Sequence, residues 1–148
     1  MVETKVYQEK PQGFAPQANV VAGYIDVMDR ILMMQLAPGK PEAGKWGVPA
    51  GKIDKGEALE DGLKRELWEE SGIDLKPGQL IDRIGALYIC KPHLCFEYHL
   101  FYLKLDTEPK VTLSREHVAY QWVNRTEMNQ LDLMISEQEA LSFFFQKT

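Results

Sequence analysis

Residues 51–73 read GKIDKGEALEDGLKRELWEESGI, and the second half of this stretch has the period of an α-helix. Leu59, Leu63 and Leu67 recur every fourth residue, so a helix would carry them as one apolar stripe. Acidic residues come first and a glycine follows the last turn, as is usual at the two ends of a helix. The sequence therefore predicts a helix over residues 57–71 whose leucines face a core.

Three glutamates of this helix fall on or beside the apolar stripe. With Leu59 at zero on a helical wheel, Glu70 lies at about 20°, Glu66 at about 340° and Glu69 at about 280°. Carboxylates that are close together and desolvated repel one another and need a counter-charge. Arg65 reaches Glu69 at i,i+4, but one guanidinium does not balance three acids. The pattern predicts a divalent-metal site, since oxygen-rich clusters suit Mg²⁺ or Mn²⁺.

An acidic surface helix is the alternative interpretation. The exposed arc of the wheel already holds Glu60, Asp61, Lys64 and Trp68, so the three glutamates lie on the wrong side for it. Gly62 costs about 1 kcal/mol relative to alanine inside a helix, which indicates that another segment approaches closely there.

Nine fixed positions in this stretch resemble the Nudix box, and the lead-in WGVPAGK at residues 46–52 is also similar to the segment that precedes the box in that superfamily. A match at nine spaced positions is far more specific than a short glycine motif. The matching residues are Gly51, Glu57, Arg65, Glu66, Leu67, Glu69, Glu70, Gly72 and Ile73.

The resemblance implies an α/β protein with the Nudix fold, a three-layer α/β/α sandwich around a mixed β-sheet. It implies hydrolysis of a nucleoside diphosphate linked to another moiety, with Mg²⁺ or Mn²⁺ as the cofactor. Glu69 and Glu70 would be the main metal ligands, and Glu66 a further ligand or the base that deprotonates water. Arg65 would orient the glutamates.

Other positions receive roles from the same resemblance. Gly51 and Glu57 would shape the loop and the start of the helix, and Gly72 would end it. The carbonyl of Ala50 is a further metal-ligand candidate, although many relatives carry glycine there. Residues 114–122, SREHVAYQW, resemble a segment of dinucleoside polyphosphate hydrolases, so Glu116 is a candidate extra ligand or alternative base. The alternative interpretation is that Glu116 is an exposed acidic residue at the start of a strand, with no role in the site.

Three further residues are candidates for substrate binding. Lys52 follows the box glycine, and Trp46 and Tyr88 could stack on a base. Packing is the favoured alternative for both aromatic residues, and for Tyr88 this means a cross-strand aromatic pair. A zinc site is rejected, because Cys-x₂-His-x-Cys-x₃-His over residues 90–99 is not a usual ligand spacing.

The remaining sequence predicts two β-hairpins, a further strand and a final helix. Ser136 and Glu139 form a capping-box pattern at the start of that helix. We expect one domain over residues 1–148, with residues 1–18 as a tail or edge segment. The expected strands cover residues 20–27, 31–36, 80–90, 95–105 and 117–123.

Composition limits the classes of partner. A chain of 148 residues that is 45% hydrophobic is long enough to bury one core. Its net charge of −5 disfavours bulk binding to nucleic acid or to anionic membranes. The first eight residues do not resemble a signal peptide, no run is long enough to cross a bilayer, and the two cysteines fit a reducing compartment. We expect a cytoplasmic protein with a small nucleotide substrate. The sequence leaves open whether the protein forms a homodimer.

The substrate is less well determined than the reaction. A nucleoside triphosphate or a dinucleoside polyphosphate is the leading expectation, ahead of a nucleotide sugar of the ADP-ribose type. The proline found fifteen residues after the box in ADP-ribose enzymes is Tyr88 here. Two other classes are a Nudix-fold module that binds a nucleotide without cleaving it, against which the intact glutamates argue, and an isomerase of the isopentenyl diphosphate type, for which no catalytic-cysteine context is recognisable.

Overall fold

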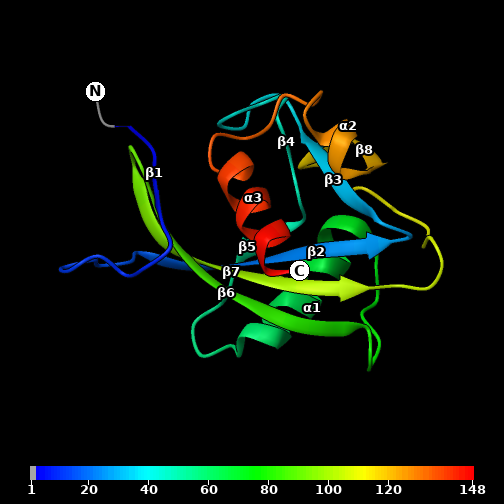
Figure 1. Cartoon of the computed structure of the whole chain (residues 1–148), viewed down its shortest axis with the longest axis horizontal. Coiled ribbons are helices and arrows are strands. Elements are labelled where there is room, and N and C mark those ends of the chain that lie inside the picture. Colours follow the sequence, from blue (N-terminus) through cyan, green and yellow to red (C-terminus); the bar gives the residue numbers. More distant parts are fainter. Residues whose placement is uncertain (1–2) are drawn as a thin grey trace.

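The structure of the chain, a computed structural model, describes residues 3–148. It contains eight strands and three helices within that range (Figure 1). Met1 and Val2, the start of the predicted tail, lie outside the described residues. The strands are β1 (Lys5–Tyr7), β2 (Ala18–Val27), β3 (Arg30–Leu36), β4 (Trp46–Gly47), β5 (Ala50–Lys52), β6 (Leu80–Lys91), β7 (Leu94–Lys104) and β8 (His117–Val123), and the helices are α1 (Leu59–Ser71), α2 (Arg125–Met128) and α3 (Glu137–Lys147).

The strands form one mixed sheet in the order β1-β6-β7-β2-β3-β4, with β5 paired to β2 and β8 paired to β3. The central pair, β2 and β7, is parallel, and the other pairs are antiparallel. A tight turn joins β2 to β3, where Met28 and Asp29 both have positive φ and the backbone N–H of Asp29 donates to Asp26 Oδ1 over 2.9 Å. The predicted strands are therefore present, with short additions at β1, β4 and β5.

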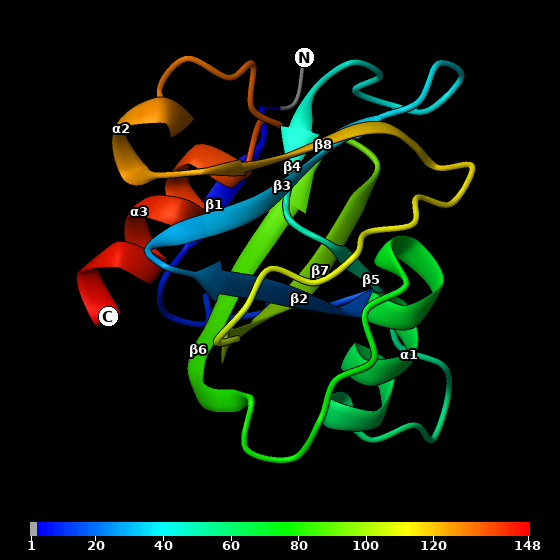
Figure 2. The same ribbon diagram turned by 90° about the vertical axis from the view of Figure 1, so that its right-hand side faces the viewer.

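Helices cover both faces of the sheet. Figure 2 shows α1 on one side and α2 and α3 on the other. Leu63 and Leu67 of α1 are fully or almost fully buried against Val21 and Phe101, and each such leucine stabilises the fold by about 1.5–3 kcal/mol. The opposite face packs α3 against the sheet, with Phe144 stacked on Tyr24 at 4.8 Å between ring centroids. This arrangement confirms the predicted three-layer α/β/α sandwich.

The predicted capping box of the last helix is wrong. Ser136 has φ −87° and ψ −10°, already helical, and its side chain makes no capping hydrogen bond. A side-chain cap needs an extended residue at the N-cap position. The chain instead has a capping box on α2, where Asn124 accepts from the backbone of Glu127 and the Glu127 carboxylate accepts from the backbone of Asn124.

The cysteines also differ from the expectation. Cys90 and Cys95 face each other across the β6–β7 hairpin, with their Cα atoms 4.0 Å apart, and form a disulfide. The two cysteines were expected to fit a reducing compartment, and this expectation did not include a disulfide. The register of the hairpin explains the pair, because the four residues between the cysteines place the two side chains opposite each other. In the described part of the chain, no helix is long and apolar enough to span a bilayer.

Candidate active site

Helix α1 presents its three glutamates at three different depths. Glu70 is 5% exposed, the Glu66 side chain is 13% exposed and the Glu69 side chain is 53% exposed. These values follow the helical wheel, on which Glu70 and Glu66 overlap the leucine stripe and Glu69 borders it. One side of a single helix thus carries carboxylates from the core to the solvent.

Arg65 holds two of these glutamates and the loop before the helix together. Its Nε and Nη2 donate to the two carboxylate oxygens of Glu57, each over 2.9 Å. Its Nη1 donates to Glu66 Oε1 over 2.9 Å and to Glu69 over 3.3 Å. Nη2 also donates to the backbone oxygen of Lys52 over 3.1 Å. Because such paired contacts fix a planar guanidinium, Arg65 orients the carboxylates around it.

Two glycines let other groups approach the helix. A Cβ at Gly51 would overlap the carboxylate of Glu66, so only glycine leaves room for that side chain. A Cβ at Gly62 would lie 2.6 Å from Ile53 and 3.0 Å from Glu57, which confirms the predicted close approach at this position. The loop over residues 51–57 therefore lies directly on α1.

The loop between β7 and β8 closes the other side of the site. It runs past the end of α1 (Figure 2), where the backbone N–H of Thr112 donates to the oxygen of Ser71 over 2.8 Å. This brings Glu116 to the helix. An open cavity of about 330 Å³ lies between the two segments, and its lining residues are Glu66, Glu69, Glu70, Ser114, Arg115 and Glu116.

The pKa values of the glutamates differ with their depth and with their partners. Burial, together with the nearby carboxyl groups of Glu66 and Glu116, raises the pKa of Glu70 to about 9. Burial also raises the pKa of Glu66, against the opposing effect of Arg65. By contrast, the hydrogen bonds from Arg65 lower the pKa of Glu57 to about 2. Glu70 therefore lacks a counter-charge like the one that Arg65 gives Glu57.

The carboxylate oxygens of the cavity are chemically suited to bind a divalent cation. Carboxylate oxygens are the ligands that Mg²⁺ and Mn²⁺ prefer, and a cation would relieve the repulsion that raises the pKa of Glu70. The carboxylates are not gathered at ligand distances: among residues 3–148, no three acidic, histidine or cysteine side chains converge as a preformed metal site. The Glu66 carboxylate instead turns to Arg65, and Glu70 accepts from the backbone N–H of Ala50 over 3.0 Å.

Comparison with known proteins identifies the fold family. A family model of the NUDIX domain matches residues 16–143. The chain belongs to the Nudix family. It is 34% identical over 116 residues to the putative 8-oxo-dGTP diphosphatase 2 of Mycobacterium tuberculosis, which covers 76% of this chain and 77% of the relative.

Two other Nudix proteins support this result. The oxidized purine nucleoside triphosphate hydrolase of Mus musculus is 30% identical over 105 residues, covering 71% of this chain and 65% of the mouse protein. The crystal structure of the MutT protein from Methanosarcina mazei Go1 superposes with a TM-score of 0.75 at 27% identity, covering 89% of this chain and 93% of that one. The family and the hydrolase class predicted from the Nudix box are confirmed.

The three residues predicted to bind substrate lie outside the cavity. Trp46 is 8% exposed and packs in the core on the α3 side of the sheet. Tyr88 contacts Phe14 edge-on, with the ring centroids 5.5 Å apart, and pairs with Tyr7 across β1 and β6. Lys52 is exposed beside the box and contributes its backbone oxygen to Arg65. None of the three lines the carboxylate cavity.

Sequence reasoning missed three residues, two in the cavity and one buried elsewhere. Ser114 and Arg115 line the cavity, and their adjacency to Glu116 was the available signal. The third residue, Glu137, is buried between α3 and the sheet, where it accepts from the backbone N–H of Val48 over 3.2 Å. No periodicity marked Glu137, because it lies in the first turn of α3, where exposed acids are common.

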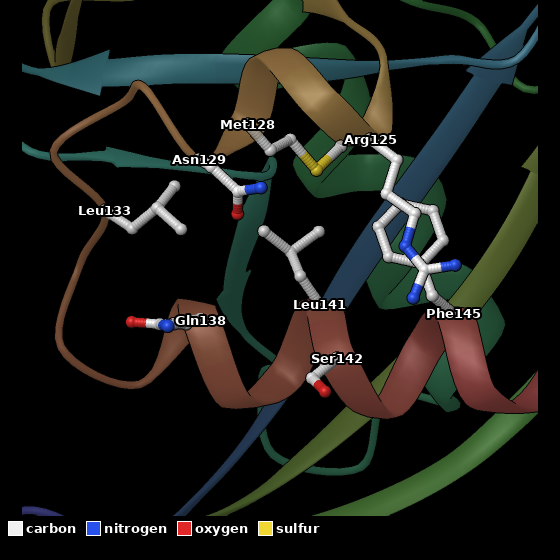
Figure 3. A pocket seen from close by; sticks show the side chains of 8 residues that line it. All are labelled: Arg125, Met128, Asn129, Leu133, Gln138, Leu141, Ser142 and Phe145. Carbon is white, nitrogen blue, oxygen red and sulfur yellow. The ribbon is translucent and has the colours of Figure 1, made fainter.

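A separate hollow of about 270 Å³ lies between α2 and α3 (Figure 3). Arg125 lies over the ring of Phe145 at its edge, with Cζ 4.8 Å from the ring centroid. The other residues that line this hollow are Met128, Asn129, Leu133, Gln138, Leu141 and Ser142, so the hollow has no carboxylate in its lining. The groups suited to phosphate chemistry therefore lie in the α1 cavity.

Proposed function

We propose that this protein is a metal-dependent pyrophosphohydrolase that cleaves nucleoside triphosphates. The observation that carries the proposal is that Glu66, Glu69, Glu70 and Glu116 all line one open cavity. The names of the bacterial and mouse relatives, a diphosphatase of 8-oxo-dGTP and a hydrolase of oxidized purine nucleoside triphosphates, favour this substrate class.

The reaction adds water across one phosphoanhydride bond. The oxygen of water bonds to one of the two phosphorus atoms joined by the bridge between the α- and β-phosphates, the bond from that phosphorus to the bridging oxygen breaks, and the leaving group keeps the bridging oxygen. The proton of the water passes to a carboxylate. A nucleoside triphosphate then yields a nucleoside monophosphate and pyrophosphate. When bound, Mg²⁺ or Mn²⁺ supplies positive charge against the phosphates and lowers the pKa of water.

The protein's own groups position the reactants. Arg65 holds Glu66 and Glu69 in place and is itself held by Glu57, so the rim of the cavity is rigid before substrate arrives. Glu69 and Glu70 would be the main ligands of the cation, with the carbonyl of Ala50 as a further one. Glu66 and Glu116 are the two candidate bases, because both carboxylates line the cavity.

A dinucleoside polyphosphate is the second candidate substrate. It is favoured by the likeness of the Glu116 to Trp122 segment to dinucleoside polyphosphate hydrolases. The same four carboxylates would serve for either substrate, so the choice depends on groups that contact the far end of the phosphate chain.

The test is cleavage by the purified protein in Mg²⁺ and, separately, Mn²⁺. Nucleoside triphosphates, their oxidised purine forms, dinucleoside polyphosphates and ADP-ribose are incubated separately, and the products are resolved by chromatography. We expect pyrophosphate and a nucleoside monophosphate from the triphosphates, with no cleavage in the presence of a chelator.

Two variants of α1 separate catalysis from charge. Glu69→Gln should lower kcat by at least about 100-fold, because a group that positions the reacting atoms is removed. Glu60→Gln makes the same chemical change on the exposed face of the same helix and should keep wild-type kcat. Equal activity of the two variants would contradict the assignment of this cavity, and binding of a nucleotide without cleavage would favour a non-catalytic module.

A further inference from the structure

Arg115 is a cation of the cavity that no carboxylate engages. It lines the cavity beside Ser114 and Glu116, and within residues 3–148 its side chain makes no ion pair or hydrogen bond. Arg65, in contrast, is committed to Glu57, Glu66 and Glu69. An arginine that lines a cavity with four glutamates and pairs with none of them leaves its guanidinium available to an anion from outside.

The backbone on both sides of Arg115 is anchored. Upstream, Thr112 donates to the end of α1 over 2.8 Å, and Leu113 packs against the buried core on that face. Downstream, the backbone N–H of Ala37 donates to the oxygen of Glu116 over 2.9 Å. The N–H of Glu116 also donates to Ser114 Oγ over 3.2 Å. Arg115 therefore projects from a fixed turn, so little ordering of the main chain is needed when it binds.

The other cation near this turn is already paired. Lys40 lies 3.4 Å from Glu116 Oε1, and both side chains are about half exposed. A lysine in that position lowers the negative charge at the rim but does not offer two parallel donors. Arginine does, and its planar fork matches the oxygens of a phosphate.

The end of a polyphosphate is the part of the substrate that needs such a group. A terminal phosphate has three unbridged oxygens and carries about −1.5 to −2 of charge near neutral pH, whereas a phosphate bridged on both sides carries one negative charge. A dinucleoside polyphosphate and ADP-ribose have no terminal phosphate. A cation that binds the free end therefore distinguishes nucleoside triphosphates from molecules that are capped at both ends.

We propose that Arg115 binds the terminal phosphate of the substrate and so selects nucleoside triphosphates over doubly capped polyphosphates. This inference rests on the proposed function, because it places the polyphosphate in the carboxylate cavity. Arg115 acts by binding and positioning, while proton transfer stays with the glutamates.

The experiment compares Arg115→Gln with the wild type on two substrates. For a nucleoside triphosphate, we expect KM to rise about 10- to 100-fold, the usual effect of losing a charge-assisted contact, with a smaller change in kcat. For a dinucleoside polyphosphate, KM should change much less; where that compound is not cleaved, its inhibition constant replaces KM. Arg115→Lys should restore part of the loss. Calorimetric binding of inorganic tripolyphosphate gives a readout that does not depend on turnover and should weaken in parallel.

Lys64→Gln is the matched control. It removes one positive charge from the exposed face of α1 and should leave both substrates unaffected, since distant exposed charges are screened by salt. Equal losses of Arg115→Gln on both substrates, an unchanged KM, or the same loss in Lys64→Gln would overturn the inference. If the wild type cleaves nothing, the proposed function fails, and tripolyphosphate binding still decides the role of Arg115.

Discussion

Gly51 shows how one missing side chain shapes the site. Any Cβ at this position would overlap the Glu66 carboxylate, so Gly51→Ala should force Glu66 away from Arg65. We expect kcat to fall on the order of 100-fold, as for other small displacements of positioning groups, with little change in thermal stability. Steady-state kinetics together with thermal unfolding measures both quantities.

The control for this prediction is a double variant. If the alanine acts through Glu66, adding Gly51→Ala to Glu66→Ala should cause no further loss, because the displaced group is already absent. Additive losses would instead indicate that Gly51 acts through the backbone of the loop.

The positions of the box glutamates could be predicted, but only some of the contacts around them could. The helical period alone places Glu70 within the apolar stripe and Glu69 at its border, and Glu69 is the more exposed of the two in the structure. The i,i+4 rule likewise anticipates the contact of Arg65 with Glu69. The stronger contact of Arg65 with Glu57 depends on how the loop folds back onto α1, and sequence spacing does not report that.

The buried leucine stripe of α1 anchors this helix to the sheet, so shortening one of these leucines should destabilise the fold. Leu67 is fully buried, and its Cδ2 lies close enough to Gly23 that a Cβ there would be only 2.9 Å away. Leu67→Ala should lower the free energy of unfolding by about 2–5 kcal/mol, measured by denaturant titration. Its neighbour Trp68 is 62% exposed, so Trp68→Ala should change stability far less. Similar losses in both variants would show that α1 does not depend on this stripe.

Long elements could be predicted from the sequence, and short ones could not. The strands of the two hairpins and helix α1 carry several periods of an apolar pattern, and each was found within a few residues of its bounds. Helix α2 has only four residues and β4 only two, too few for any period to appear. The placement of Arg115 also escaped prediction, because it depends on a loop anchored by backbone hydrogen bonds at Thr112 and Ala37.

Glu137 connects the layers of the whole molecule. From α3 it accepts from Val48, which lies between β4 and β5, and it lies 3.5 Å from the hydroxyl of Tyr24 on β2 and 3.4 Å from that of Tyr98 on β7. Those two hydroxyls are themselves 3.0 Å apart. A charge on Glu137 is therefore placed at the centre of the molecule.

The stability of the fold should consequently depend on pH through Glu137. Burial raises its pKa to about 8, even though Val48, Tyr98, Lys91 and Tyr24 act in the opposite direction. Since the pKa in the folded state lies above the ordinary value of 4.5, the protonated form is favoured on folding. This contribution is fully present below about pH 4.5 and is lost progressively as the pH rises to about 8. We expect the free energy of unfolding to fall by a few kcal/mol over that interval.

Glu137→Gln isolates this effect from the other carboxylates. The amide keeps an acceptor for Val48 but does not ionise, so the loss of stability between pH 5 and pH 8 should be smaller in the variant. Glu70, whose pKa is also raised, contributes a loss of the same sign in both proteins and cancels from the difference. Denaturant unfolding at several pH values measures that difference. Parallel curves for the two proteins would mean that Glu137 stays in one protonation state across the range and that its charge is not what limits the fold.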